Sequence, residues 1–201
     1  NVNAVEEYTE TRDRYEFLTK QKEDIIQAEE KLKTIIKDLS SLMEKQFREK
    51  LEIISDNFND VFREMFGGGQ AYLKLAEEDN VLDSGIDIIA QPPGKTLQSM
   101  MLLSGGERAL TAIAILFSIL KMKPSPFCIL DEIEAALDDA NVLRFGDYLQ
   151  RFSNETQFIV ITHRKGTMEA ADVLYGVTMQ EAGVSKIVSV KFDEAVRDNA
   201  I

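Results

Sequence analysis

FCILDEIEAALDDANV, residues 127–142, contains the pattern that decides the fold of this chain. FCILD is a continuous apolar strand that ends in acids, and FIVIT at residues 158–162 is a second one. The helix expected between them begins at Asp138 or Asp139, and its apolar face consists of Val142, Phe145, Leu149 and Phe152. Two buried strands joined by a helix predict a right-handed βαβ unit with parallel pairing. The fold class expected is therefore α/β.

The first 66 residues predict a long helix because they contain neither proline nor glycine, and GGGQ at 67–70 ends it. Apolar residues recur every seven positions at Leu18, Ile25, Leu32 and Leu39, and a stutter follows at Met43. We expect a coiled-coil arm over residues 1–55, paired with a helix from elsewhere, and a globular lobe over residues 56–201. The sequence does not begin with Met, so we expect a piece of a longer protein.

Other segments complete the expected lobe. Two strand-like segments, 71–77 and 85–91, are separated by a polar turn, and the apolar segment 109–120 predicts a buried helix. Segments 172–180 and 184–192 are predicted to be the last strands of the lobe. In the latter Val188, Val190 and Phe192 alternate with polar residues, which is typical of a half-exposed edge.

Composition excludes some functions. The formal net charge is -12 and the pI is about 4.6, so the chain is a poor DNA binder by itself. Its one cysteine, Cys128, lies in an apolar run and is expected to be a small buried residue, in agreement with a reducing compartment. No apolar run is long enough to span a membrane.

GKT, residues 94–96, matches the last three positions of the P-loop pattern Gly-x-x-x-x-Gly-Lys-Ser/Thr. The first glycine would fall at Ile89, Pro92 and Pro93 precede Gly94, and no clear helix follows. We therefore expect a Pro-Pro-Gly turn between strands, with Lys95 solvated.

SGGE, residues 104–107, opens the apolar helix. Ser104 and Glu107 fit a capping box. Capping does not account for Gly105 and Gly106, since each glycine in a helix costs up to ~1 kcal/mol relative to alanine. Two interpretations stay open, a plain helix cap and an anion site in which the free N–H groups of the helix meet a phosphate.

Three further polar residues follow the two apolar strands. Asp131 and Glu132 lie at the carboxyl end of the first, the edge where open α/β sheets bind ligands. Asp131 suits a water-bridged Mg²⁺ and Glu132 suits the activation of a water, although acids are also common where a strand turns into solvent. His163, the only histidine, follows the second strand directly. A lone histidine is usually structural, but its place on the same sheet edge favours a neutral imidazole that contacts a phosphate.

Together, LLSGGERALTA, FCILDEIEAALDDANV and FIVITHRKGTM resemble the signature motif, the Walker B motif with its D-loop, and the switch histidine of an ABC-type ATPase. ABC transporters usually have LSGGQ and DEPTSALD at these places. Glu107, Ile133 and Glu134 differ from that pattern and, with the helical arm, indicate the SMC (structural maintenance of chromosomes) branch. Residues 70–192 with the arm resemble the C-terminal half of a bacterial SMC head domain.

The resemblance implies a C-terminal lobe with a parallel-strand core, flanking helices and antiparallel edge strands, and it implies ATP and Mg²⁺ as cofactors. Ser104, Gly105 and Gly106, in one motif with Glu107, would contact the γ-phosphate of ATP held by an opposite head. Asp131 would serve Mg²⁺ and Glu132 would be the catalytic base. Asp138 would be the D-loop acid and His163 the switch.

The family's Walker A and Q-loop lie in the N-terminal half of the head, and this sequence contains neither. The chain alone is therefore expected to be inactive. Expected partners are that N-terminal half, a second head in a homodimer, a kleisin subunit, and DNA held by the whole complex. The function implied is chromosome condensation and segregation by ATP-driven DNA entrapment or loop handling, in the cytoplasm at the nucleoid.

Two alternatives stay open. One is the head of a coiled-coil ATPase that repairs DNA double-strand breaks, which the missing part of the arm would decide. The other, of a different class, is a non-catalytic module that docks a kleisin. Glu132 argues against the second, because docking does not require a base at that position.

Overall fold

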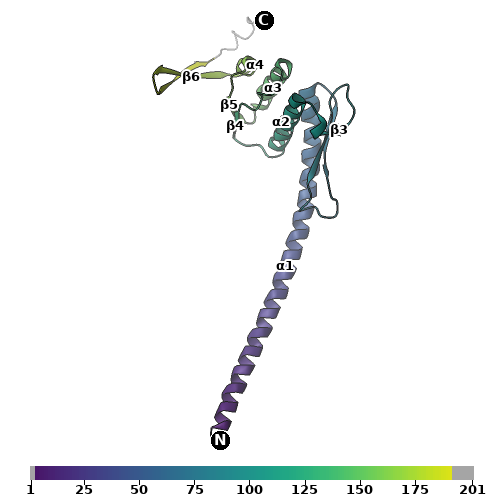
Figure 1. Ribbon diagram of the computed structural model, residues 1–201, viewed down its shortest axis with the longest axis vertical. Helices are drawn as coiled ribbons and strands as arrows, with labels where there is room; N and C mark the ends of the chain where they lie inside the picture. Colours follow the sequence, from purple (N-terminus) through teal and green to yellow (C-terminus); the bar gives the residue numbers. More distant parts are fainter. Residues whose placement is uncertain (1–2, 192–201) are drawn as a thin grey trace. The chain divides into compact units, whose positions relative to one another are not determined.

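The computed structural model describes residues 3–191 (Figure 1), and Phe192 of the last expected strand lies outside them. Contacts within the chain divide it into two compact units, Asn1–Glu49 and Lys50–Ile201. The boundary expected at residue 55 remains a prediction. None of the helices in the described part of the chain is both long enough and apolar enough to cross a membrane.

Helix α1 (Ala4–Phe66) is continuous, as the absence of proline and glycine predicts. In the first unit its seven-residue apolar repeat at Leu18, Ile25, Leu32 and Leu39 is exposed. Exposed i,i+4 ion pairs such as Glu29–Lys33, 2.6 Å apart, support this part of the helix, although each contributes only a few tenths of a kcal/mol. An exposed apolar repeat of this kind agrees with a coiled-coil arm, which stays a prediction.

The last turns of α1 belong to the second unit and enter its core. Phe58, Phe62 and Met65 are fully buried, and the rings of Phe62 and Phe66 stack at 4.1 Å. The helix ends where the sequence predicts, at three glycines with positive φ. At Gly69 a Cβ atom would lie 2.2 Å from the carbonyl oxygen of Gln91, so only glycine fits this close approach.

A three-stranded antiparallel sheet follows, in the order β1-β2-β3. It consists of β1 (Gln70–Leu75), β2 (Ile86–Gln91) and the short β3 (Gln98–Ser99), which was not predicted and leads into the 3-10 turn η1 (Met100–Leu102). The free edge of β1 lies against α1, because the N–H groups of Ala71 and Leu73 donate to Asn59 and Ser55 at 3.1 and 3.0 Å. The helix thus satisfies donors that an edge strand would otherwise expose.

Helices α2 (Gly105–Met122) and α3 (Asp139–Phe152) pack around Phe117, which is fully buried. Its ring contacts the rings of Phe145, Tyr148, Phe152 and Phe158, with centroids 4.9–6.2 Å apart. Burial raises the pKa of Tyr148 in this cluster. The helix expected over 109–120 is present, but Leu116 and Ile119 on its outer face are exposed, so α2 is only partly buried.

The parallel pair consists of β4 (Phe127–Asp131) and β5 (Gln157–Ile161), with Asp131 opposite Ile161, as the βαβ pattern predicts. The expectation that both strands are buried is wrong for one face. Leu130 lies in the core, whereas the alternate residues Phe127, Ile129, Ile159 and Ile161 are about half exposed. Cys128, expected to be buried, is also only partly so, and desolvation raises the pKa of its thiol. Residues of this chain therefore cover one face of the pair.

The short helix α4 (Lys165–Glu169) precedes an antiparallel hairpin of β6 (Val173–Glu181) and β7 (Val184–Lys191). The half-exposed edge expected for the last strand is not observed. Ile187 and Val188 point to opposite faces, yet they are 67% and 49% exposed. The described part of the chain thus buries neither face of the hairpin at this point.

The cluster around Phe117 yields a test of the core. Phe117→Ala should lower the free energy of unfolding by about 3–5 kcal/mol, because it removes a buried ring and leaves a cavity. Urea denaturation measures the change. The matched control is Phe17→Ala on the exposed part of α1, where a change below about 0.5 kcal/mol is expected. Similar losses in both variants would contradict this assignment of the core.

Candidate functional site

The N-terminus of α2 is organised by one carboxylate. Ser104 is the N-cap, and Glu107 accepts hydrogen bonds from the Ser104 backbone N–H at 3.1 Å and from its hydroxyl at 2.7 Å. The capping box predicted from the sequence is therefore present. The remaining N–H groups of the first turn have no intrahelical acceptor, as at the start of any helix.

Lys95 belongs to this arrangement, which the sequence did not indicate. Its backbone N–H donates to the Pro92 carbonyl at 3.1 Å across a turn with Gly94 at φ 77°, so the expected Pro-Pro-Gly turn is confirmed. Its ammonium, however, lies 2.8 Å and 2.9 Å from the two carboxylate oxygens of Glu107. Lys95 is thus solvated, as expected, with 46% of its side chain exposed, but it also makes an ion pair that the sequence did not indicate. The hydrogen bonds from Lys95 and then Ser104 lower the pKa of Glu107.

The two glycines of SGGE have different surroundings. A Cβ atom on Gly106 would lie 3.3 Å from the carbonyl oxygen of Ala136, so close approach of the segment before α3 explains this glycine. A Cβ atom on Gly105 would meet nothing within 4 Å. The fold of this chain therefore accounts for Gly106 but not for Gly105, which leaves open space at the start of α2.

Ser104, Gly106 and Glu107 line a hollow with a volume of about 620 Å³, whereas Gly105 and Lys95 do not. Its wall joins the signature-like motif to the segment before α3 and to the proline turn, through Ser104, Gly106, Glu107, Ala136, Asp138, Asn141, Arg144, Pro92, Pro93 and Phe66. Asp138 caps α3 by accepting from the Asn141 N–H at 2.8 Å, which decides between the two caps that the sequence allowed. The structure thus brings Ser104, Gly106, Glu107 and Asp138 together.

Arg144 in this wall was not predicted to be part of a site. Its guanidinium donates to the Phe66 carbonyl at 3.1 Å, where α1 ends, and so satisfies one of the free carbonyls at that end. No signal in the sequence marks it, because it occupies an ordinary polar position of α3.

Glu132 and His163 form a second group, at the carboxyl ends of β4 and β5. Glu132 has φ 49°, an unusual value for a residue other than glycine, and its N–H donates to the Ile161 carbonyl at 2.9 Å. His163 Nδ1 lies 3.5 Å from Glu132 Oε1, as expected for residues on one sheet edge. Asp131, Glu132 and His163 do not line the hollow beside Ser104. The candidate residues thus lie at two places in the fold.

Glu134 lies in the segment between Glu132 and Asp138, and its sequence pattern marked it only as a difference from ABC transporters. It is 1% exposed and accepts hydrogen bonds from the hydroxyls of Thr162 and Thr167. A buried acid in a segment rich in exposed acids has no distinctive pattern in the sequence.

The residues present fit part of what a Mg²⁺–nucleotide would require. The free N–H groups at the start of α2 are suited to an anion, with open space at Gly105 and with Arg144 in the hollow that Ser104 and Gly106 line. Within residues 3–191 no group of three or more His, Cys, Asp or Glu side chains could hold a metal ion. Asp131 alone would therefore need waters, phosphate oxygens or residues of another chain to complete a Mg²⁺ site.

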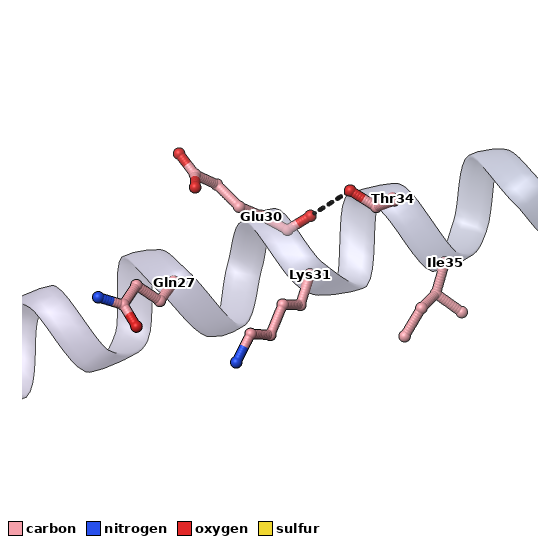
Figure 2. A pocket seen from close by; sticks show the side chains of 5 residues that line it. All are labelled: Gln27, Glu30, Lys31, Thr34 and Ile35. Carbon is pink, nitrogen blue, oxygen red and sulfur yellow. Dashed lines mark hydrogen bonds between the residues drawn. The ribbon is translucent and has the colours of Figure 1, made fainter.

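Another hollow lies on α1 and carries no chemistry. Figure 2 shows that Gln27, Glu30, Lys31, Thr34 and Ile35 line it from successive turns of a single helix. The Thr34 hydroxyl donates to the Glu30 carbonyl at 3.0 Å, a local bond of the helix to itself. This hollow is a groove between exposed side chains of the arm.

Comparison with known proteins identifies the family. The model described as RecF/RecN/SMC N terminal domain matches residues 6–186, most of the chain, and the chain belongs to that family. Its structure is an α/β fold similar to solved SMC head domains.

Among curated relatives, the chromosome partition protein Smc of Bacillus subtilis is 58% identical over 194 residues, which cover 96% of this chain and 16% of that protein. The chain thus spans only a small part of the relatives it matches.

Two solved structures show the same likeness. The first is a chain from a structure described as "Structural biochemistry of ATP-driven dimerization and DNA stimulated activation of SMC ATPases". It is 43% identical to this chain with a TM-score of 0.69, and the match covers 78% of this chain and 94% of that one. The other is the Pyrococcus furiosus Smc head domain with an extended coiled coil, bound to the C-terminal domain of ScpA. It is 38% identical with a TM-score of 0.75, covering 98% of this chain and 50% of that one.

The Lys95–Glu107 ion pair predicts a pH-dependent stability. Since its pKa is lowered, ionised Glu107 stabilises the fold fully above the ordinary value of 4.5, and this contribution is lost as the pH falls through the lowered value. Lys95→Met should therefore cost about 0.5–1 kcal/mol at pH 7, and the difference from the unsubstituted chain should vanish in acid.

Urea denaturation at several pH values measures this difference. Lys74→Met is the matched control, because Lys74 is exposed on β1 and has no salt bridge within residues 3–191. A loss for Lys95→Met that stays constant down to pH 2 would show that the ion pair is not its cause.

Proposed function

We propose that this chain is the C-terminal half of an SMC ATPase head and supplies two half-sites for ATP hydrolysis between two heads. The order of the signature motif, Walker B motif, D-loop and switch histidine supports this proposal. The solved SMC ATPase chain of which 94% is covered supports it as well, because that chain extends little beyond the matched region.

One observation carries the proposal. The hollow at Ser104 and Asp138 does not include Asp131, Glu132 or His163, although all of these belong to motifs of one reaction. A nucleotide at the sheet edge and a nucleotide at the hollow would therefore each meet half of the machinery. Two heads arranged with the hollow of one facing the sheet edge of the other would complete both sites.

At the hollow, this chain would bind a phosphate carried by the opposite head. The N–H groups at the start of α2 would donate to its oxygens, and Gly105 would allow close approach. The Ser104 hydroxyl, which donates to Glu107 in this structure, would have to turn to the phosphate to donate as well. Glu107 brings a negative charge to this place, and the Lys95 ammonium at 2.8 Å neutralises it. Without such a cation, Glu107 would repel the phosphate.

At the sheet edge, this chain would supply the hydrolytic residues. Glu132 would accept a proton from the attacking water, and His163 beside it would donate to a phosphate oxygen. Asp131 would hold Mg²⁺ through water, and the ion would neutralise phosphate charge. The unusual φ of Glu132 supports a functional role, since strained backbone often occurs at active sites.

ATP binding would also require the N-terminal half of the head, because the Walker A motif does not occur in these 201 residues. The exposed face of β4 and β5 supports such a partner. Phe127, Ile129, Ile159 and Ile161 form an apolar surface that a soluble head would need to cover. We therefore propose that the chain is inactive alone and active with that half.

Further partners follow from the relatives. The Pyrococcus furiosus head is described with the C-terminal domain of ScpA bound, so a kleisin is proposed here too. The exposed hairpin β6–β7 would offer apolar surface to such a subunit. The role proposed is chromosome partition in the cytoplasm, as the name of the Bacillus subtilis relative indicates. DNA would be held by the whole complex, because this chain has a net charge of -12.

The experiment that tests this function mixes the chain with its N-terminal half and follows ATPase activity against protein concentration. We expect no activity from either half alone, and a rate per head that rises with concentration, because two heads share each site. A concentration-independent rate, or activity of this chain alone, would refute the shared site.

Gly105→Ala sharpens this experiment. In the isolated chain the added methyl group meets nothing within 4 Å, so stability should stay equal or rise by about 0.4–1 kcal/mol. Dimerisation of ATP-loaded heads should fall at least about tenfold, because the methyl group occupies the space left for the phosphate. Unchanged ATP-dependent dimerisation would remove α2 from the interface.

Glu132→Gln in the reassembled head should separate binding from hydrolysis. The amide keeps the size of the side chain but cannot accept the proton, so turnover should fall about 10²-fold or more while ATP-bound dimers accumulate. Size-exclusion chromatography with ATP measures the dimer. If turnover stays at the unsubstituted level, Glu132 is not the base.

A further inference from the structure

Glu134 is a buried carboxylate that the proposed reaction does not use. It is 1% exposed, it has no Lys or Arg salt bridge within residues 3–191, and its Oε2 atom has no hydrogen-bond partner. Burying an unpaired carboxylate costs several kcal/mol, so an ordinary packing role would be better served by leucine or methionine. Its position needs another explanation.

The contacts of Glu134 join two segments that are distant in the sequence. Glu134 follows β4. Of the two residues that donate hydrogen bonds to it, Thr162 comes directly after β5 and Thr167 lies in α4. Both hydroxyls donate to the same oxygen, Oε1, with the Thr167 bond at 3.1 Å. Since β4 and β5 are parallel neighbours, Glu134 fastens together the two loops at one sheet edge.

The fastened segment contains His163. Thr162 immediately precedes it, and the Thr162 hydroxyl also accepts a hydrogen bond from the Arg164 N–H at 3.0 Å. Arg164 in turn makes an ion pair with Asp139 at 2.8 Å. Both neighbours of His163 are thus bound to the segment that contains Glu134 and Asp139.

His163 itself has little packing to hold it. Its side chain is 64% exposed, and its Nδ1 atom lies 3.5 Å from Glu132 Oε1. Its position is therefore determined by its neighbours in the chain. We propose that Glu134 is a positioning residue, which holds residues 162–167 through the two threonine hydroxyls and so keeps His163 beside Glu132.

Thr167→Val offers the sharpest test. Valine keeps the shape of threonine but lacks the hydroxyl, which in the structure donates to Glu134. The substitution therefore removes the hydrogen bond between α4 and Glu134 and keeps the bulk of the side chain. Thr156→Val is the matched control. Thr156 is equally buried, and its hydroxyl donates to the Ser125 carbonyl at 2.9 Å, at the opposite end of β5.

Two readouts in the chain alone need no nucleotide. Hydrogen exchange of the Arg164 amide should become about tenfold faster in Thr167→Val and stay within twofold in Thr156→Val. His163 is the only histidine, so its ring signals in a proton NMR spectrum need no assignment, and they should shift and broaden only in Thr167→Val. Unchanged exchange and unchanged ring signals in Thr167→Val would overturn the proposal.

Glu134→Gln tests whether the oxygen acceptor is what matters. Glutamine keeps a carbonyl oxygen for the two hydroxyls, so exchange at Arg164 should stay within about threefold of the original chain. If exchange of the Arg164 amide became as fast in Glu134→Gln as in Thr167→Val, the role of this oxygen acceptor would be contradicted.

The consequence for hydrolysis rests on the proposed function. In the reassembled head, Thr167→Val should lower kcat about tenfold with KM unchanged, and Thr156→Val should leave both unchanged. A loss confined to KM would contradict positioning of His163. If the two halves show no ATPase activity at all, the proposed function fails, while the exchange and NMR measurements still decide the role of Glu134.

Discussion

The structure depends on a parallel pair of strands that is apolar on both faces. The residues of β4 and β5 that point inward pack on Phe117 and its neighbours, and those that point outward remain exposed. Burial of the inner face sets the register in which Asp131 lies opposite Ile161. That register brings the ends of both strands to one edge, so Glu132 and His163 meet there. The described residues of this chain do not bury the outer face of β4 and β5. We propose that the N-terminal half of the head packs against it.

Close contacts of the backbone arrange the other part of the site. The first turn of α2 approaches the Ala136 carbonyl so closely that a Cβ atom on residue 106 would lie 3.3 Å from its oxygen, which favours glycine there. The Pro-Pro-Gly turn brings Lys95 to Glu107. The start of α2 thus has two neighbours: the Ala136 carbonyl lies against its backbone, and the Lys95 ammonium binds the carboxylate of Glu107. Gly105 is left free, and it is the position where a group from outside the chain could approach.

Much of this was predictable from residue patterns. The end of α1 at the glycines, the capping box at Ser104, the turn at Gly94 and the parallel pairing of the two apolar strands all follow from local rules, and all are present. These features depend on residues a few positions apart, or on a period of two or 3.6. The motifs for phosphate and water chemistry lie on such features, so they could be located as well, although their roles remain proposals.

What the sequence did not show concerns contacts between distant segments. Lys95 lies twelve positions before Glu107, and its sequence pattern gives no sign that the two side chains form an ion pair. Continuous apolar strands suggested burial on both faces, but a sequence does not say whether the covering residues belong to the same chain. Glu134 served only to distinguish the SMC branch, and nothing in its pattern indicates that it is buried against threonines 28 and 33 residues away.

The sequence by itself determined the longer elements, their order and the residues capable of chemistry, because propensity, capping and periodicity act over one or two turns of chain. It did not predict the short β3, η1 and α4. Only the tertiary structure decided which carboxylates are paired, buried or free, because the charge environment of a side chain comes from whatever packs against it. It also decided that Ser104 and Asp138 share a hollow while Glu132 and His163 share a sheet edge. That separation follows from which strand ends and helix ends the core brings together.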